Sequence, residues 1–290
     1  MREKSNIRGI LLVALSAASF GVMPILAKIA YTYGIGMYTM LFLRFLSGTV
    51  FMFLLMGIRR LPVPAGKARW YWFLMGAACY APQSLCYFMA LRYASAGVVA
   101  LLFYIHPILV TAGSAFLFGE RITRKKLAAL LLALAGASAI IGTTFQVSLA
   151  GILFALCSAG IYTVYILTGS RVVGPGMGVQ SSAFIMLGAA SVYGILNLVF
   201  GFVPPEEPAG YIPLILIAFV STVVAMWSFF SGMEITGPAV AALVSLLEPV
   251  VTVLLSVAVL KERLTVNVVI GGCLVLLAMI IISLPDRKQH

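Results

Sequence analysis

Long apolar stretches recur along the whole chain, separated by short segments rich in charge, glycine or proline. About twenty residues of helix are needed to cross the hydrocarbon core of a bilayer, and charge-free stretches such as 70–91 and 264–285 have that length. The pattern predicts ten membrane spans, over residues 8–31, 37–58, 70–92, 96–118, 125–142, 149–170, 179–201, 211–233, 238–260 and 266–284. We therefore expect an all-α membrane protein.

The composition is that of a chain embedded in lipid rather than dissolved in water. Hydrophobic residues make up 62% of it, charged residues only 9%, and the mean hydropathy is +1.12, whereas soluble proteins contain about 25% charged residues. The formal net charge of +11 would suggest a nucleic-acid partner for a soluble protein. Here the basic residues lie in short loops between apolar segments, so the expected partner is the lipid bilayer and not nucleic acid.

The distribution of the basic residues predicts the orientation of the bundle. Cytoplasmic loops collect Lys and Arg, and these residues cluster in the two terminal tails and in the loops "RRLPVPAGKAR" and "GERITRKK". Such segments fall on one side if both termini are cytoplasmic, and the opposite side then carries the acidic pair Glu206 and Glu207. Lys261 and Arg263 run against this bias. We predict a multi-pass protein of the cell membrane with both termini in the cytoplasm.

The two halves of the chain are related by an internal repeat at an offset of 142 residues. This offset aligns "RYASAGVVALLFYIHPILVTAGSAFLFGERITRKKL" with "EITGPAVAALVSLLEPVVTVLLSVAVLKERLTVNVV". It pairs Pro107 with Pro249, and "ERIT" at 120–123 with "ERLT" at 262–265. Leucine matched with leucine is common by chance in membrane proteins, but proline, Glu-Arg and threonine shared at one constant offset are not.

The repeat also fixes how the chain divides. The same offset places Gly9 on Gly151 without an insertion or deletion, so the first apolar segment, whose basic tail resembles a signal peptide, is predicted to be a retained helix. The expected domains are 1–146 and 147–290, with five spans each. Because five is odd, the second half enters the membrane from the opposite side. The predicted fold is ten transmembrane helices, arranged as two inverted five-helix repeats around a central cavity.

Prolines are expected to kink three of the predicted spans near mid-depth. Under the repeat, His106-Pro107 matches Glu248-Pro249, and Pro82 lies in the third span. Proline lacks an N–H, so the carbonyl four residues earlier loses its helical partner and the helix bends. Transporters often place their binding sites at such interruptions, where the freed backbone groups line a cavity.

Glu248 and His106 are the polar residues directly before two of these prolines. A charged carboxylate at the bilayer centre costs about 2.5–3.5 kcal/mol on insertion scales, so Glu248 should be neutral, paired or hydrated. Glu248 either faces a substrate cavity and changes its protonation or partner as access alternates, or bonds across helices and holds the halves together. His106 either contacts substrate or protons, or satisfies a contact of its own helix.

Polar and aromatic residues elsewhere in the spans complete the predicted site. Arg44, about two turns into the second span, either receives a substrate carboxylate or snorkels toward the outer face, and Lys28 is expected to snorkel. Aromatic residues at helical spacing serve either packing or a cavity wall. The predicted substrate-binding residues are Glu248, His106, Gln83, Tyr80, Arg44, Tyr162, Tyr165 and Trp227.

Other patterns point away from catalysis and metal binding. The chain contains no P-loop, HExxH, GxSxG or EF-hand motif. Its four cysteines lie within apolar segments and show no CxxC spacing, so we expect neither a metal nor a cofactor. Thr123 and Thr265 are suited to N-cap the fifth and tenth spans. The Glu-Arg pairs before them suit capping and interfacial anchoring, with a gating salt bridge as the alternative.

The chain resembles the drug/metabolite transporter superfamily, in the branch with two EamA-type domains. The resemblance covers nearly the whole chain and rests on "SFGVMPILAKIA", "FLRFLSG", "PILVTAGSAFLFGERIT" and "EPVVTVLLSVAVLKERLT". It implies a ten-helix inverted-repeat carrier with a central cavity that moves amino acids or other small metabolites, often outward. Glu248-Pro249 matches the family pattern, whereas His106 stands where many relatives are less polar.

The leading hypothesis is a secondary transporter that exports amino acids or similar small metabolites by alternating access, with protons as the candidate coupling ion. It is not expected to be an enzyme. The alternatives are an intramembrane enzyme that uses Glu248 and His106 as acid and base, and a channel or scaffold that does not transport by switching. No sequence pattern brings these two residues to a nucleophile or a metal.

Overall fold

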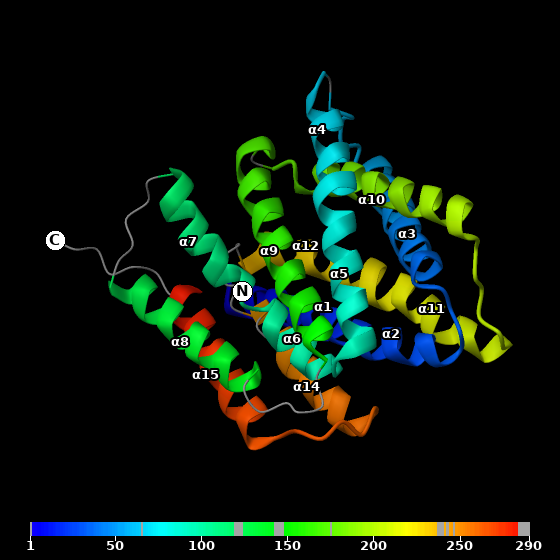
Figure 1. Ribbon diagram of the computed structural model, residues 1–290. Coiled ribbons are helices and arrows are strands. Elements are labelled where there is room, and N and C mark those ends of the chain that lie inside the picture. Colours follow the sequence, from blue (N-terminus) through cyan, green and yellow to red (C-terminus); the bar gives the residue numbers. More distant parts are fainter. Residues whose placement is uncertain are drawn as a thin grey trace.

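The computed structural model describes residues 2–64, 66–118, 124–141, 148–174, 176–236, 241, 244–245 and 247–283. Within these residues the chain is all-helical and has no strands, and helices lie in each of the predicted ranges (Figure 1). Six helical runs among them are long and apolar enough to cross a membrane, and shorter apolar helices lie at 127–136, 247–258 and 266–278. The "ERIT" motif at 120–123, with Thr123, and the start of the ninth predicted span lie outside the described residues.

The helices of each half follow one another with short connections. The first half contains α1 (Arg2–Gly21), α2 (Met23–Thr32), α3 (Met37–Ile58), α4 (Ala68–Met75), η1 (Gly76–Tyr80), α5 (Ala81–Tyr93), α6 (Ala96–Phe103), α7 (His106–Phe118) and α8 (Arg124–Ile141). The second half contains α9 (Leu149–Val172), α10 (Gly178–Phe200), η2 (Pro208–Gly210), α11 (Tyr211–Ala218), η3 (Phe219–Val224), α12 (Ala225–Thr236), α14 (Leu247–Ala258) and α15 (Val266–Ser283).

Several predicted spans are interrupted helices rather than continuous ones. The third and eighth predicted spans each contain a π-helical segment, η1 and η3, and Pro82 lies in the first turn after η1. The fourth is broken at Tyr104 and Ile105, between α6 and α7, and Pro107 is the second residue of α7. In the ninth, α14 begins at Leu247, two residues before Pro249. Interruptions of this kind have identifiable causes, and proline and π-bulges are two of them.

The main helix–helix contacts repeat when the two halves are exchanged by the 142-residue offset. Helix α1 packs against α12 and α14, and its equivalent α9 packs against α5 and α7, which are equivalent to α12 and α14. The equivalents α3 and α10 pack against each other, as do α8 and α15, which lie side by side in Figure 1. The π-helices η1 and η3 also fall at equivalent positions. The halves therefore match at these helix pairs.

Individual atoms repeat the same exchange. The Ser16 hydroxyl donates to the Ala225 carbonyl at 2.7 Å, and the equivalent Ser158 hydroxyl donates to the Gln83 carbonyl at 3.1 Å. Gly9 and Gly151, paired by the sequence repeat, both sit at close helix crossings where a side chain has no room. Gly9 faces residues 235–236, and Gly151 faces the equivalent residues 93–94.

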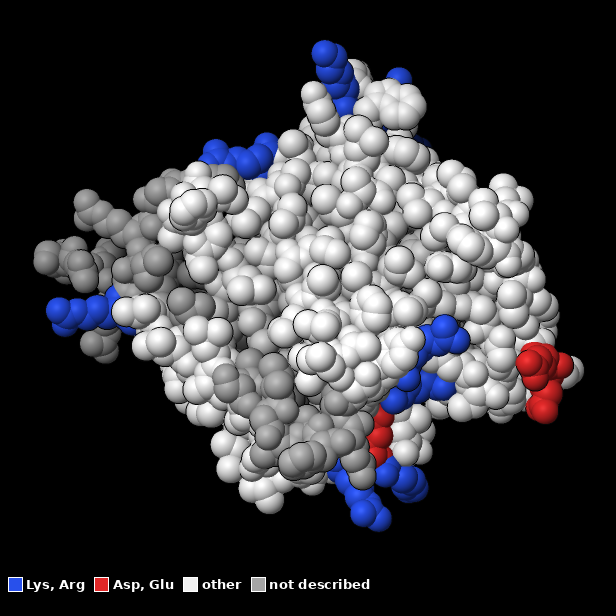
Figure 2. Space-filling view, viewed as in Figure 1, with Lys and Arg blue, Asp and Glu red and all other residues white. Residues whose placement is uncertain are grey.

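The outer surface of the bundle is apolar, while its centre is a continuous core. Large apolar side chains point outward, such as Phe116 at 90% exposure and Leu198 at 87%. Charges gather at the ends of the helices on the face seen in Figure 2, with blue residues at the α4 end and both colours at the opposite end. A soluble protein rarely exposes so much apolar surface. The fold is that of an integral membrane protein whose exposed face contacts lipid.

The start of α15 follows the predicted capping pattern. The Thr265 hydroxyl accepts a hydrogen bond from the Val268 amide at 3.3 Å, which is the N-cap expected from the "ERLT" motif. Glu262, three residues earlier, does not serve α15. It bonds instead to the first turn of α6 in the other half of the chain.

Candidate functional site

Glu248 lies in the first turn of α14 and faces elements of the first half. The Tyr104 hydroxyl, at the break between α6 and α7, lies close enough to its carboxylate to interact with it. Arg44 of α3 is within electrostatic range of the same carboxylate. Part of the surface of residue 248 is accessible. The Glu248 side chain therefore lies between elements of both halves.

His106 satisfies the backbone group that Pro107 leaves without a helical partner. Its Nδ1 lies 3.0 Å from the Phe103 carbonyl oxygen, the carbonyl that a helix would otherwise bond to residue 107. Because a carbonyl only accepts, Nδ1 carries the proton and Nε2 is left as the acceptor in the neutral ring. The imidazole also packs edge to face on Tyr162 of α9, with ring centroids 4.7 Å apart. His106 thus has a local structural role and a contact with the second half.

The aromatic rings next to His106 form a continuous stack across the two halves. Tyr162 stacks on Tyr165 with ring centroids 5.4 Å apart, and Tyr165 stacks on Tyr80 of η1 at 5.2 Å. Tyr80 meets Phe45 of α3 edge to face at 5.3 Å. Each of the three tyrosines is partly exposed rather than fully buried. Rings at such distances prefer these offset and edge-on geometries, which hold them as a rigid wall.

Arg44 is buried and does not snorkel toward a surface. Its side chain is 7% exposed, and its guanidinium lies over the rings of Phe45 and Phe88 at 5.1 and 5.8 Å from their centroids. Among the described residues the guanidinium has no ion pair within 4.0 Å, and Nε has no hydrogen-bond partner. Buried arginines are ordinarily paired. Among the described residues, Arg44 is a buried cation with no carboxylate partner and an unpartnered Nε.

We call Arg44, Tyr80, Tyr104, His106, Tyr162, Tyr165 and Glu248 the central polar cluster. Six of these seven positions were predicted from the sequence, and Tyr104 was not. Tyr104 lies two residues before His106, at the break between α6 and α7. The sequence signal for Tyr104 was a tyrosine three residues before Pro107, next to the expected helix interruption. Tyr87 of α5 also lies within electrostatic range of Glu248 and Arg44.

Two predicted site residues lie elsewhere. Gln83 is 5% exposed, and its Nε2 donates to the Ser158 hydroxyl at 2.9 Å, so its amide joins α5 to α9. Trp227 of α12 is 45% exposed on the outer surface of the bundle. The structure does not bring either side chain to the central polar cluster.

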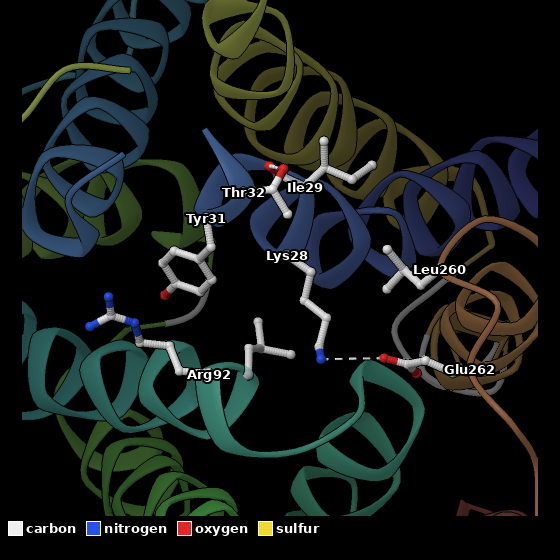
Figure 3. A pocket seen from close by; sticks show the side chains of 8 residues that line it. Lys28, Ile29, Tyr31, Thr32, Arg92, Leu260 and Glu262 are labelled. Atoms are coloured by element: carbon white, nitrogen blue, oxygen red, sulfur yellow. Dashed lines mark hydrogen bonds and ion pairs between the residues drawn. The ribbon is translucent and has the colours of Figure 1, made fainter. Parts of the chain in front are cut away.

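A second group of charged residues lies at the end of the bundle where α2, α5, α6 and the α14–α15 connection meet (Figure 3). Lys28 Nζ is 3.3 Å from Glu262 Oε1, so Lys28 pairs with the second half instead of snorkelling. Glu262 Oε1 accepts from the Ala96 amide at 3.0 Å, and Oε2 from the Gly97 amide at 3.5 Å. One carboxylate of the second half therefore holds two helices of the first.

Comparison with known proteins agrees with this arrangement. A sequence model described as the EamA-like transporter family matches residues 7–142 and again residues 149–284. The chain belongs to the EamA-like transporter family. The two matches are displaced by the same 142 residues as the repeat, so this EamA-family chain carries two EamA domains and belongs to the drug/metabolite transporter superfamily.

Two known proteins match nearly the whole EamA-family chain. The uncharacterized transporter YcbK of Bacillus subtilis (strain 168) is 26% identical over 286 residues, which span 93% of this chain and 92% of that protein. A crystal structure superposes with a TM-score of 0.69, covering 99% of this chain and 100% of that chain at 20% sequence identity. The structural likeness at this identity shows the fold alone. Family membership identifies the chain as a membrane transporter.

Proposed function

We propose that this chain is a secondary transporter that exports amino acids or similar small metabolites across the cell membrane by alternating access. One observation carries the proposal. The buried guanidinium of Arg44 has no ion pair within 4.0 Å among the described residues, yet lies within electrostatic range of Glu248. The outward direction rests on the family resemblance, and the cytoplasmic placement of both termini rests on the bias of basic loops.

In the proposed architecture, residues 1–146 and 147–290 are two inverted five-helix repeats that enclose a central cavity. The exchange of contacts under the 142-residue offset supports this architecture, because two copies related by a two-fold axis must repeat each contact. The equivalent hydrogen bonds of Ser16 and Ser158 support it at the level of single atoms. Alternating access then consists of one repeat rocking against the other around the central polar cluster.

The chemistry of the central polar cluster suits a zwitterion. Arginine presents a planar fork of N–H donors that matches a carboxylate, while the Glu248 carboxylate can accept from an ammonium group. An α-amino acid placed between the Arg44 guanidinium and the Glu248 carboxylate would neutralise both charges and bridge the two groups. The stacked rings of Tyr80, Tyr162 and Tyr165 supply an apolar wall for its side chain. Burial of an unpaired charge costs free energy. A bound substrate carboxylate would offset that cost for Arg44.

Counterflow of labelled amino acids into proteoliposomes tests the proposal. Saturable, exchangeable uptake is expected for the wild type, and Arg44→Gln should reduce it at least tenfold, because a hydrogen bond to a charged group contributes about 1.5–3 kcal/mol. Arg69→Gln, which removes an exposed arginine near the start of α4, is the matched control and should leave counterflow unchanged. Unsaturable uptake would indicate a channel, and chemically altered label would indicate an enzyme.

Glu248 is tested by its own variant. Glu248→Gln keeps the size of the side chain but removes its charge and proton exchange, and should abolish both counterflow and its pH dependence. Glu207→Gln is the control, since Glu207 is exposed at the end of the bundle. If Glu248→Gln transports with an unchanged pH profile, protons are not coupled through this residue, and Glu248 only holds the halves together.

A further inference from the structure

A hollow of about 500 Å³ opens between the halves, at the end of the bundle that carries the Lys28 and Glu262 pair. Helices α2 and α5 form one side of it, and the α14–α15 connection forms the other (Figure 3). Its volume is in the range of small-molecule sites. The lining residues are Lys28, Ile29, Tyr31, Thr32, Leu91, Arg92, Leu260 and Glu262.

Glu262 is fully occupied within this hollow. Its carboxylate pairs with Lys28 at 3.3 Å and accepts from the first two amides of α6. The amino end of a helix and an ammonium group both favour a carboxylate. The site already binds one carboxylate, supplied by the protein itself, and Lys28 is the cation that reaches both this group and the open space of the hollow.

Arg92 is the second cation of the hollow and has no anionic partner among the described residues. Its guanidinium lies 5.2 Å from the centroid of the Tyr31 ring, and the Tyr31 hydroxyl is used by the Phe88 carbonyl at 3.0 Å. In Figure 3 the arginine head lies beside the ring and not toward Glu262. Arg92 also borders a neighbouring hollow of about 310 Å³. Glu262 therefore neutralises Lys28 but not Arg92, and positive charge is left over at a site with room for a solute.

We propose that this hollow binds a small carboxylate-bearing solute between Arg92 and Lys28, and that Glu262 is the resident carboxylate with which the solute competes. Arg92 is exposed, so its side chain can turn from Tyr31 into the hollow, where the incoming carboxylate bonds its guanidinium fork and takes Lys28 from Glu262. The α14–α15 connection then loses one of its contacts with α2. A carboxylate is the favoured ligand because Lys28 already pairs with a carboxylate in the same space. Binding here requires no transport, so the site stands or falls separately from the proposed function.

Thermal unfolding of the purified full chain in detergent tests the site. Sodium succinate and sodium acetate are titrated against sodium chloride at equal ionic strength, so that screening is matched. Saturable stabilisation by the carboxylates is expected for the wild type, since a ligand that binds the folded state raises its stability. Arg92→Gln should weaken the apparent affinity about tenfold, because it removes a charge-assisted hydrogen bond.

Glu262→Gln separates competition from a merely structural role. Loss of the Lys28 pair lowers the stability of the unliganded protein, but removal of the competitor should tighten carboxylate binding several-fold. A structural role alone predicts weaker binding, or none. Arg263→Gln, an exposed neighbour, is the control and should titrate like the wild type.

Three results would overturn the proposal. In the first, Arg92→Gln binds the carboxylates with the same apparent affinity as the wild type. In the second, Glu262→Gln binds them more weakly. In the third, an anionic lipid added to the micelle stabilises the protein but the free carboxylates do not. The last result would assign the charge to a lipid headgroup. Failure of counterflow with intact carboxylate binding would leave this site in place and remove only the proposed function.

Discussion

Replacement of Ser158 by alanine should destabilise the interface between the halves more than the equivalent change in the first half. Ser158 is fully buried and makes two bonds to Gln83, accepting from its Nε2 at 2.9 Å and donating to its carbonyl at 3.1 Å. The equivalent Ser16, also buried, makes one bond, to the Ala225 carbonyl at 2.7 Å. Residue 225 is an alanine, so Ser16 accepts no side-chain amide hydrogen bond of the kind that Gln83 donates to Ser158. The repeat thus supplies a matched control within one chain.

The expected magnitudes follow from the partners left behind. Hydrogen bonds between helices in membranes contribute about 0.6 kcal/mol on average and about 1.7 at most, which sets the cost of Ser16→Ala. The Ala225 carbonyl keeps the Ser228 hydroxyl at 3.2 Å. Ser158→Ala removes two bonds and leaves a buried amide donor without its partner, which costs about 1–3 kcal/mol. Ser158→Ala should therefore exceed Ser16→Ala by about 1–2 kcal/mol.

Unfolding in mixed micelles with a rising fraction of denaturing detergent measures these costs. Combining Ser158→Ala with Gln83→Leu completes a double-mutant cycle, in which the serine change should cost much less once the amide is gone. Equal losses for the two serines, or additive losses in the cycle, would refute the paired geometry. Counterflow by Gln83→Leu at a temperature where it is folded then tests whether Gln83 also contacts substrate. We expect its counterflow to match that of the wild type.

Two further pairs of substitutions test packing and the position of the cluster. Gly76→Ala should cost about 3 kcal/mol or more and lower the folded yield, because its Cβ would collide with the Ile185 carbonyl of α10. Gly57→Ala meets no atom within 4 Å and should be neutral or stabilising by about 0.5–1 kcal/mol. Equal effects of the two changes in detergent unfolding would contradict the close crossing of η1 and α10. Tyr162→Ala should lower counterflow at least tenfold whereas Trp227→Ala leaves it unchanged, and the reverse order would place the substrate outside the cluster.

Local sequence patterns were sufficient to identify the helical segments and their repeat. Hydropathy depends on runs of about twenty residues, so each helix was located without knowledge of its neighbours. The offset of 142 residues then identified which positions are equivalent, such as Gly9 with Gly151. A proline frees the carbonyl four residues before it, so the interruption at Pro107 was predicted from chemistry within four residues. These are all properties of residues close in sequence, or of the chain compared with itself.

Contacts between helices were decided by the tertiary structure. The repeat could not say that Gln83 meets Ser158, 75 residues away, or that Glu262 caps α6 instead of its own neighbour α15. Arg44 was expected to bind a substrate or to snorkel, and only its neighbours show that it is buried beneath aromatic rings. Apolar segments carry little information about which faces meet, because lipid and helix interiors are equally apolar. Hydrophobicity placed this chain in the membrane, and packing of helix against helix determined which polar groups meet inside it.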